Sequence, residues 1–171
     1  MSSVDGIKKA DQLEKGRAAL VKKITEAGGN EASFGEEEGF ERQLRVLVQV
    51  NTSGEASKSG VEPNDALELC RHIREQCHHL RLSGLMTIGA IARSQQTTPE
   101  TENEDFICLR ETRDKVADGL GIAKEDLDLS MGMSSDFEGA IAQGSDEVRI
   151  GSTIFGERPP KDTKAKGGDT G

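Results

Sequence analysis

Segments with a helical hydrophobic pattern alternate along this chain with short runs that are rich in apolar and β-branched residues. The helical segments are 4–25, 66–77, 104–120 and 136–143, and the strand-like segments are 44–50, 80–88, 127–133 and 148–150. Strands separated by helices pair in parallel through right-handed crossovers. We therefore expect an α/β fold with about four parallel strands. A closed (β/α)8 barrel needs eight strands, so the fold is either a small open sheet or part of a barrel.

Composition limits both the core and the classes of partner. Only 33% of the 171 residues are hydrophobic, and neither Trp nor Tyr occurs. The net charge of −9 argues against nucleic acid or an anionic membrane as a partner. No apolar run approaches the roughly 20 residues of a membrane span. The N-terminus lacks the pattern of a signal peptide and the three cysteines cannot all pair with one another, so we expect a cytoplasmic protein with reduced thiols.

Two segments are typical of irregular structure. Residues 26–39 are dominated by Gly and Glu and predict a mobile surface loop. From residue 158 onward the chain consists mainly of Pro, Lys, Gly, Asp and Thr, which predicts a disordered tail over 158–171. We expect residues 1–157 to form the ordered domain.

Two apolar runs near the C-terminus end in small and hydroxyl residues where a helix could begin. They are LSMGMSSDF at 129–137 and VRIGSTIFG at 148–156. Backbone N–H groups at a helix N-terminus, with a hydroxyl beside them, suit an anion. The two turns therefore predict a phosphate held from both sides, by Ser134 and by Gly151, Ser152 and Thr153.

Ser134 and Ser135 also have a purely structural interpretation. Either one could cap the helix that follows, and Ser135 with Glu138 has the spacing of a capping box. Capping and phosphate binding use the same N–H groups, so the two interpretations are compatible.

Several motifs together resemble the pyridoxal phosphate homeostasis proteins, also called the proline synthetase co-transcribed homologue family. They are VQVNTSGE at 48–55 with SKSG at 57–60, GLMTIG at 84–89, and the two C-terminal runs. The resemblance is dense over residues 44–158, and the segment SVDGIKKAD at 3–11 is similar to the segment after the family's fourth strand. It implies a barrel like the alanine racemase N-terminal domain, with strands five to eight present here. It also implies binding of pyridoxal 5′-phosphate (PLP) without a well-defined catalytic reaction.

The resemblance also implies which residues contact the cofactor. The implied set is Asn51, Met86, Met133, Ser134, Arg149, Gly151, Ser152 and Thr153. Arg149 would face the pyridine nitrogen of PLP and oppose its protonation by like-charge repulsion, which suits a carrier better than a transaminase. Three alternatives stay open: Arg149 pairs with a neighbouring carboxylate, Met86 packs in the core, and Asn51 caps a turn.

Part of the family pattern is missing. No motif like Val-Ser-Lys-Thr, which carries the Schiff-base lysine on the family's first strand, occurs here. The motifs of the family's second and third strands are also absent, apart from a short partial match at residues 34–36. We therefore expect a partial barrel, equivalent to the C-terminal half of a family member, that binds PLP non-covalently at most. Lys58 is the lysine within a ligand-side motif. It either holds PLP transiently as an imine or, as we favour, is a solvated lysine.

A cluster of potential zinc ligands occurs at Cys70, His72, Cys77, His78 and His79. The two cysteines are seven residues apart, about 10 Å along a helix, which is too far for two thiolates on one zinc ion. We therefore expect no metal.

The function that the resemblance implies is intracellular PLP homeostasis, by binding, buffering and delivering PLP, with PLP-dependent apo-enzymes as expected partners. The resemblance also implies that intact family members are typically monomeric, and it is compatible with a mitochondrial location of the intact protein. The open edges at 44–50 and 148–150 predict self-association of this chain. An alanine racemase-like enzyme is disfavoured by the missing lysine and the absence of Tyr. A non-functional fragment, or a subunit completed by another polypeptide, stays open.

Overall fold

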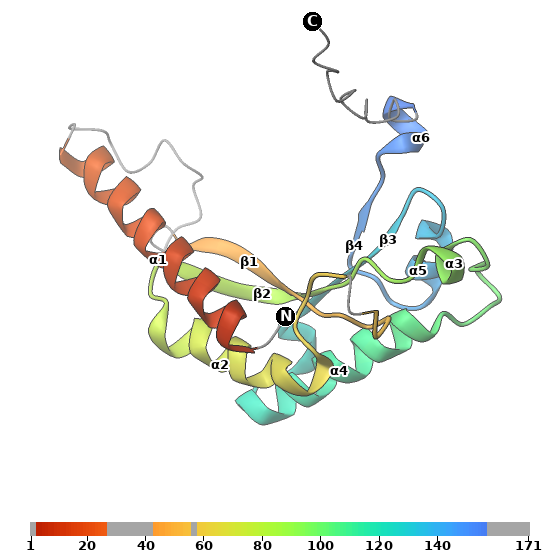
Figure 1. Cartoon of the computed structure of the whole chain (residues 1–171), viewed down its shortest axis with the longest axis horizontal. Coiled ribbons are helices and arrows are strands. Elements are labelled where there is room, and N and C mark those ends of the chain that lie inside the picture. The colour runs from red at the N-terminus through yellow and green to blue at the C-terminus, as the bar shows by residue number, and fades with distance from the viewer. Residues whose placement is uncertain (1–2, 27–42, 56–57, 157–171) are drawn as a thin grey trace, which may run out of the picture.

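A computed structural model describes residues 3–26, 43–55 and 58–156, and it contains one parallel sheet (Figure 1). The strands are β1 (Leu44–Gln49), β2 (Leu80–Met86), β3 (Asp128–Met133) and β4 (Glu147–Arg149), paired in the order β1-β2-β3-β4. The expected α/β fold with about four parallel strands is confirmed. The segments predicted as a mobile loop and a disordered tail lie outside the described residues, apart from residue 26, which ends the first helix.

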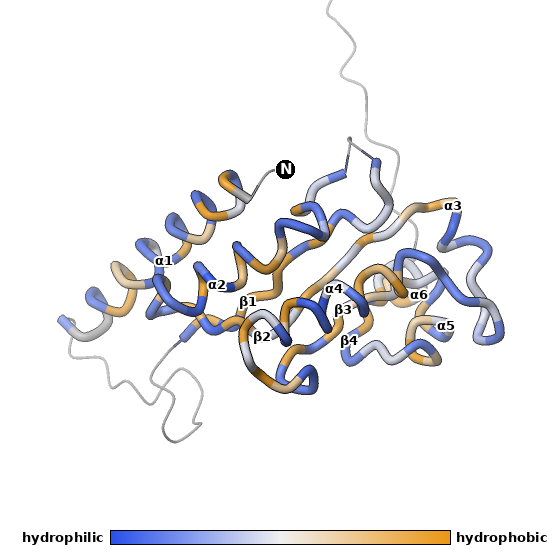
Figure 2. The backbone as a smooth tube through the Cα atoms, turned by 90° about the horizontal axis from the view of Figure 1, so that it is seen from below, coloured by the Kyte–Doolittle hydropathy of each residue, from blue (hydrophilic) through white to orange (hydrophobic). Residues whose placement is uncertain are grey.

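Three long helices lie next to one another and pack on the sheet: α1 (Ser3–Glu26), α2 (Ala66–Gln76) and α4 (Glu104–Leu120) (Figure 2). The shorter helices are α3 (Ile91–Ser94), α5 (Phe137–Ala142) and α6 (Ser152–Phe155), and two 3₁₀ turns, η2 (Pro63–Asp65) and η3 (Lys124–Asp126), precede α2 and β3. The expected polar linker before residue 104 contains α3, a single turn too short to give a hydrophobic period. None of the described helices is long and apolar enough to cross a membrane.

The core lies between the sheet and the helices and consists mainly of aliphatic side chains. Its largest fully buried members are Leu85, Leu109, Leu127, Leu129 and Met131. Full burial of such a side chain contributes roughly 1.5–3 kcal/mol. The predicted apolar positions of α4 are confirmed, because Phe106, Leu109 and Val116 are buried and Leu120 packs at the margin of the core.

Two glycines allow the close approaches that bring the later strands together. A Cβ on Gly84 would lie 2.0 Å from the carbonyl oxygen of Asp128, where β2 passes β3. Gly132 has a φ of +93°, and a Cβ there would lie 2.6 Å from the Cβ of Ala140 in α5. A larger residue at position 132 would therefore push α5 away from the end of β3, and with it the turn that contains Ser134.

Candidate cofactor site

The carboxyl ends of the four parallel strands meet at one edge of the sheet, and polar residues follow each strand there. In α/β proteins this edge is where ligands bind. The predicted phosphate turns occupy it: Ser134 follows β3, and Gly151 follows β4. The site therefore begins with the two loops at the β3–β4 end of the edge.

Ser134 and the loop after β4 are in direct contact. The Ser134 hydroxyl oxygen accepts hydrogen bonds from the backbone N–H of Gly151 at 3.0 Å and of Thr153 at 3.5 Å. Gly151, Ser152 and Thr153 are exposed, so this position is open to solvent. Two amide N–H groups thus point at one oxygen, and an anionic oxygen in that position could accept both hydrogen bonds.

The capping interpretation of Ser135 is wrong. Helix α5 begins at Phe137, and Asp136 stands at its N-cap without a side-chain cap bond. The buried Asp136 carboxylate instead accepts the backbone N–H of Met133 at 2.7 Å, and the Asp136 N–H returns to the Met133 carbonyl. Because the helix begins beyond the expected position, Ser135 and Glu138 do not occupy the first and last positions of a capping box.

Arg149 ends β4 beside Met133, its partner in the parallel register. One terminal guanidinium nitrogen donates to the carbonyl of Thr87, whereas Nε is buried and has no hydrogen-bond partner among the described residues. Burial lowers the pKa of Arg149, and the charges of Glu147 and Asp136 act in the opposite direction. No ion pair links Arg149 to a carboxylate among the described residues, so the carboxylate-pair alternative is not supported.

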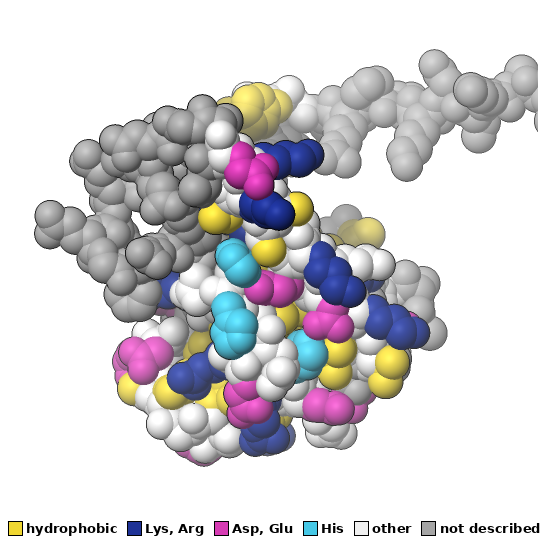
Figure 3. All heavy atoms as spheres, turned by 90° about the vertical axis from the view of Figure 1, so that its left-hand side faces the viewer, with side chains coloured by type: hydrophobic (Ala, Val, Ile, Leu, Met, Phe, Trp, Pro, Cys, Tyr) yellow, Lys and Arg dark blue, Asp and Glu magenta, His cyan; other side chains and the backbone are white. Residues whose placement is uncertain are grey.

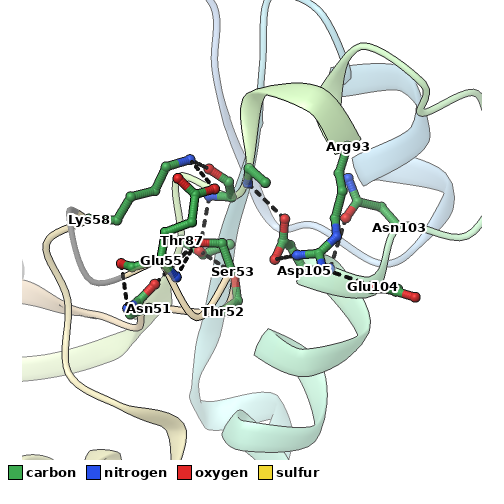
Figure 4. Close-up of polar contacts among 12 residues, drawn as sticks. Asn51, Thr52, Ser53, Glu55, Lys58, Thr87, Arg93, Asn103, Glu104 and Asp105 are labelled. Atoms are coloured by element: carbon green, nitrogen blue, oxygen red, sulfur yellow. Dashed lines mark hydrogen bonds and ion pairs between the residues drawn. The ribbon is translucent and has the colours of Figure 1, made fainter.

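Thr87 connects the strands at this edge, and the sequence analysis did not single it out. It is 2% exposed, and its hydroxyl donates to the Val50 carbonyl at 3.1 Å, accepts the Gly89 N–H at 3.2 Å and lies 2.8 Å from the Thr52 hydroxyl (Figure 4). The sequence feature that could have identified Thr87 is its position, because it is a polar residue directly after a predicted strand within the GLMTIG motif.

The remaining predicted residues separate into two groups. Asn51 is buried and its amide donates to the Glu55 carbonyl at 3.1 Å and to the Glu62 carboxylate at 3.2 Å. Its side chain therefore organises the loop after β1, in line with the turn-forming alternative. Met86 and Met133 are half-buried at the ends of β2 and β3. Met133 lies with Arg149, and Met86 pairs with Gln49 and Ser130.

The expectation that Lys58 is a solvated lysine is wrong. Its side chain is only 21% exposed, its ammonium donates to the Gly89 carbonyl, and it lies 3.7 Å from a Glu55 carboxylate oxygen (Figure 4). The carbonyl and the carboxylate together attract the cation into the loop. Lys58 thus ties the loop after β1 to the loop after β2.

A buried carboxylate, which the sequence analysis missed, holds the loop after β2. Asp105 in α4 is fully buried and accepts the Ala90 N–H at 2.8 Å and a guanidinium N–H of Arg93 at 2.9 Å (Figure 4). Asn103, the N-cap of α4, accepts the Asp105 N–H at 2.8 Å. An acidic residue in the first helical turn is common, so nothing in the sequence distinguished Asp105 from a solvated one.

Comparison with known proteins places this geometry in a family. Residues 7–159 match the family described as alanine racemase, N-terminal domain. The pyridoxal phosphate homeostasis protein of Schizosaccharomyces pombe is 50% identical over 122 residues, which are 71% of this chain and 48% of the relative. The human protein of that name is 38% identical over 158 residues, 92% of this chain and 50% of the relative. The chain thus spans about half the length of the curated relatives it matches.

Two solved structures are similar over much of the described chain. An unknown protein from Bifidobacterium adolescentis has a TM-score of 0.64 and 32% identity, covering 87% of this chain and 49% of that chain. PipY of Synechococcus elongatus, in a structure without PLP, has a TM-score of 0.50 and 26% identity, covering 67% of this chain and 50% of that chain.

Proposed function

The chain belongs to the alanine racemase N-terminal domain family and, within it, to the pyridoxal phosphate homeostasis proteins, and on this basis we propose that it binds PLP. Its role is to bind, buffer and deliver the cofactor inside the cell. One observation carries the proposal. The N–H groups of Gly151 and Thr153 converge on Ser134, at the edge of the sheet where Arg149 has a buried nitrogen without a partner.

The residues at this edge fit the phosphate of PLP. The Gly151 and Thr153 amides would transfer from the Ser134 oxygen to phosphate oxygens, and the Ser134 hydroxyl would then donate to the phosphate. Ser152 and Thr153 add two exposed hydroxyls. Hydrogen bonds to a charged group contribute about 1.5–3 kcal/mol each before entropy costs. A few such bonds give phosphate-directed affinity without a covalent anchor.

Arg149 fits the ring nitrogen. Its unpartnered Nε can donate to an unprotonated pyridine nitrogen, and this contact would satisfy a buried donor that otherwise costs free energy. A guanidinium stays protonated in proteins, so it opposes a second positive charge on the ring. PLP supplies an aldehyde and a ring that withdraws electrons most strongly when its nitrogen is protonated. The Arg149 contact therefore favours storage of PLP over catalysis.

Lys58 supports a non-covalent mode of binding. Its nitrogen donates to the Gly89 carbonyl and lies 3.7 Å from the Glu55 carboxylate, so it would have to leave both partners to reach the aldehyde of PLP. We propose PLP-dependent apo-enzymes as the recipients of the cofactor and the cytoplasm as the location.

Titration calorimetry with PLP, inorganic phosphate and pyridoxal tests the proposal. We expect one PLP site for which inorganic phosphate competes, and about a tenfold loss of PLP affinity in Ser134→Ala, equivalent to one charge-assisted hydrogen bond. Thr98→Ala, which removes a hydroxyl from an exposed turn, is the control and should bind as the parent does. Pyridoxal binding as tightly as PLP, or no PLP binding at millimolar concentration, would contradict the proposal.

A further inference from the structure

Helix α1 is attached to the C-terminal end of α2 by two pairs of histidine and carboxylate. The Nε2 of His72 lies 2.7 Å from a carboxylate oxygen of Asp11, and the Nδ1 of His79 lies 2.6 Å from one of Glu14. Figure 3 shows the histidine side chains gathered with carboxylates on this face of the molecule. The face is built from α1, α2 and the turn that follows α2, whereas the cofactor site lies in the loops at the carboxyl ends of the strands.

A thiol joins the first of these pairs. One potential ligand atom from each of Asp11, His72 and Cys77 lies within 4.8 Å of the other two. Cys77 is 1% exposed, whereas the side chains of His72 and Asp11 are 22% and 46% exposed. The thiol therefore forms the inner side of the cluster, and the carboxylate forms the side that faces water.

We propose that Asp11, His72 and Cys77 bind one Zn²⁺ ion. Carboxylate oxygen, imidazole nitrogen and thiolate sulfur are all zinc ligands, and the mixture of one soft and two harder donors suits this borderline metal. Bonds of about 2.0–2.3 Å in a tetrahedron place ligand atoms about 3.4–3.8 Å apart. The cluster atoms already lie within 4.8 Å of one another. A small rotation of the half-exposed Asp11 side chain would widen the 2.7 Å contact with His72 to the tetrahedral spacing and make room for the ion.

The charges balance when the ion binds. The Cys77 thiol releases its proton to water and becomes a thiolate, His72 contributes the lone pair of a neutral ring nitrogen, and Asp11 contributes its carboxylate. The two negative charges neutralise Zn²⁺, which offsets the cost of a buried thiolate. A water molecule takes the fourth position on the side where Asp11 is exposed.

Cys70 is not a ligand of this site, because it is seven residues from Cys77 along the chain and is buried in the hydrophobic core. The third ligand, however, is Asp11, which lies 61 residues before His72 and reaches it because α1 packs along α2. Only the packing of these two helices brings the set together.

Cobalt substitution of the full chain, purified without a histidine tag, tests the site. Thiolate ligation of Co²⁺ gives a ligand-to-metal charge-transfer absorption in the near ultraviolet. We expect this absorption to saturate at one Co²⁺ per chain, to disappear when one equivalent of Zn²⁺ is added, and to be absent in Cys77→Ser. Zn²⁺, but not Mg²⁺, should also raise the thermal midpoint, because it binds the folded state.

Three further variants distinguish a built site from adventitious thiol binding. Asp11→Asn alters the exposed ligand and leaves the buried thiol in place, so it should fold and lower Co²⁺ affinity by at least about tenfold. Cys108→Ser and His78→Gln change a cysteine and a histidine outside the cluster and should bind as the parent does. The proposal is overturned if the absorption survives Cys77→Ser or disappears in Cys108→Ser, if Asp11→Asn binds as tightly as the parent, or if no charge-transfer absorption develops.

Discussion

The guanidinium of Arg149, at the end of the last strand, donates to the backbone carbonyl of Thr87, which follows the second strand. The two residues are 62 positions apart and lie at the carboxyl ends of β4 and β2, which β3 separates. The contact fixes Arg149 without using its Nε. By holding one end of the guanidinium, the loop after β2 thus determines where the Nε–H of Arg149 lies at the cofactor site.

We expect Arg149→Gln to lower PLP affinity about tenfold or more, because it removes a charge-assisted hydrogen bond to the ring. The affinity for inorganic phosphate should stay unchanged, since phosphate touches only the Ser134 and Gly151 loops, whereas Ser134→Ala should weaken both ligands. Calorimetric titration of both variants with both ligands measures this. An equal loss of PLP and phosphate affinity in Arg149→Gln would place the guanidinium on the phosphate instead.

PLP should leave the chain on dialysis, and borohydride treatment of the mixture should leave no stoichiometric adduct by mass spectrometry. The reason is that the Lys58 nitrogen is engaged by the Gly89 carbonyl and the Glu55 carboxylate and would have to leave both to reach the aldehyde. Lys58→Arg keeps the positive charge and removes the amine, so it serves as the control. A stable adduct in the parent that is lost in Lys58→Arg would show that Lys58 bonds covalently to the cofactor.

Asp105→Asn should lower the free energy of unfolding by about 2–3 kcal/mol, because it weakens hydrogen bonds of a buried carboxylate to Ala90 and Arg93. Urea denaturation measures the change. Glu104→Gln is the matched control: Glu104 also pairs with Arg93, at 3.1 Å, but its side chain is 79% exposed, so the loss should stay below about 1 kcal/mol. Equal losses of unfolding free energy in the two variants would mean that the burial of Asp105 does not determine how much its hydrogen bonds contribute to stability.

Stability should fall as the pH rises above 9. Burial raises the pKa of the Cys70 thiol from 9.0 to about 12, so between these values the unfolded chain loses this proton and the folded chain retains it. Proton release then favours unfolding, and the contribution of Cys70 to stability is full below pH 9 and declines toward pH 12. Urea midpoints across this range should fall less steeply in Cys70→Ala. An identical slope in the variant would exclude Cys70 as the cause.

The chain should self-associate in solution. Within the described part of the chain, β1 and β4 are the two edge strands of the sheet, and Leu44, Ile154 and Phe155 beside them are 41%, 67% and 85% exposed. Unpaired edges with apolar neighbours promote association. Sedimentation should detect dimers or larger species, and Phe155→Ser should reduce them. A compact monomer that unfolds sharply above about 60 °C would show that the four strands need no partner.

The sequence predicted the described elements well because their signals are local. Helix α4 begins after Asn103 and ends before Gly121, a left-handed C-cap, as the pattern of Phe106, Leu109 and Val116 indicates. Motif order likewise predicted that the turns after β3 and β4 would meet, and Ser134 does contact Gly151.

The missed residues depend on contacts between distant segments. Whether Asp105 is a solvated first-turn acid or a buried acceptor depends on where Ala90 and Arg93 pass. Lys58 is bound because the Gly89 carbonyl lies within hydrogen-bond reach of its side chain. The cluster of Asp11, His72 and Cys77 exists because α1 packs on α2. Hydrophobic period and turn chemistry contain no information about such pairings, and they require the assembled fold.

The strands stand side by side in the same order as they occur in the chain. Each new strand can therefore add to a sheet that is already complete behind it, with no earlier strand displaced. Ser134 gains its amide donors from Gly151 and Thr153 only after β4 has docked, and Arg149 reaches Thr87 in that same event. A phosphate bound between these two loops therefore reports that β4 is paired with β3.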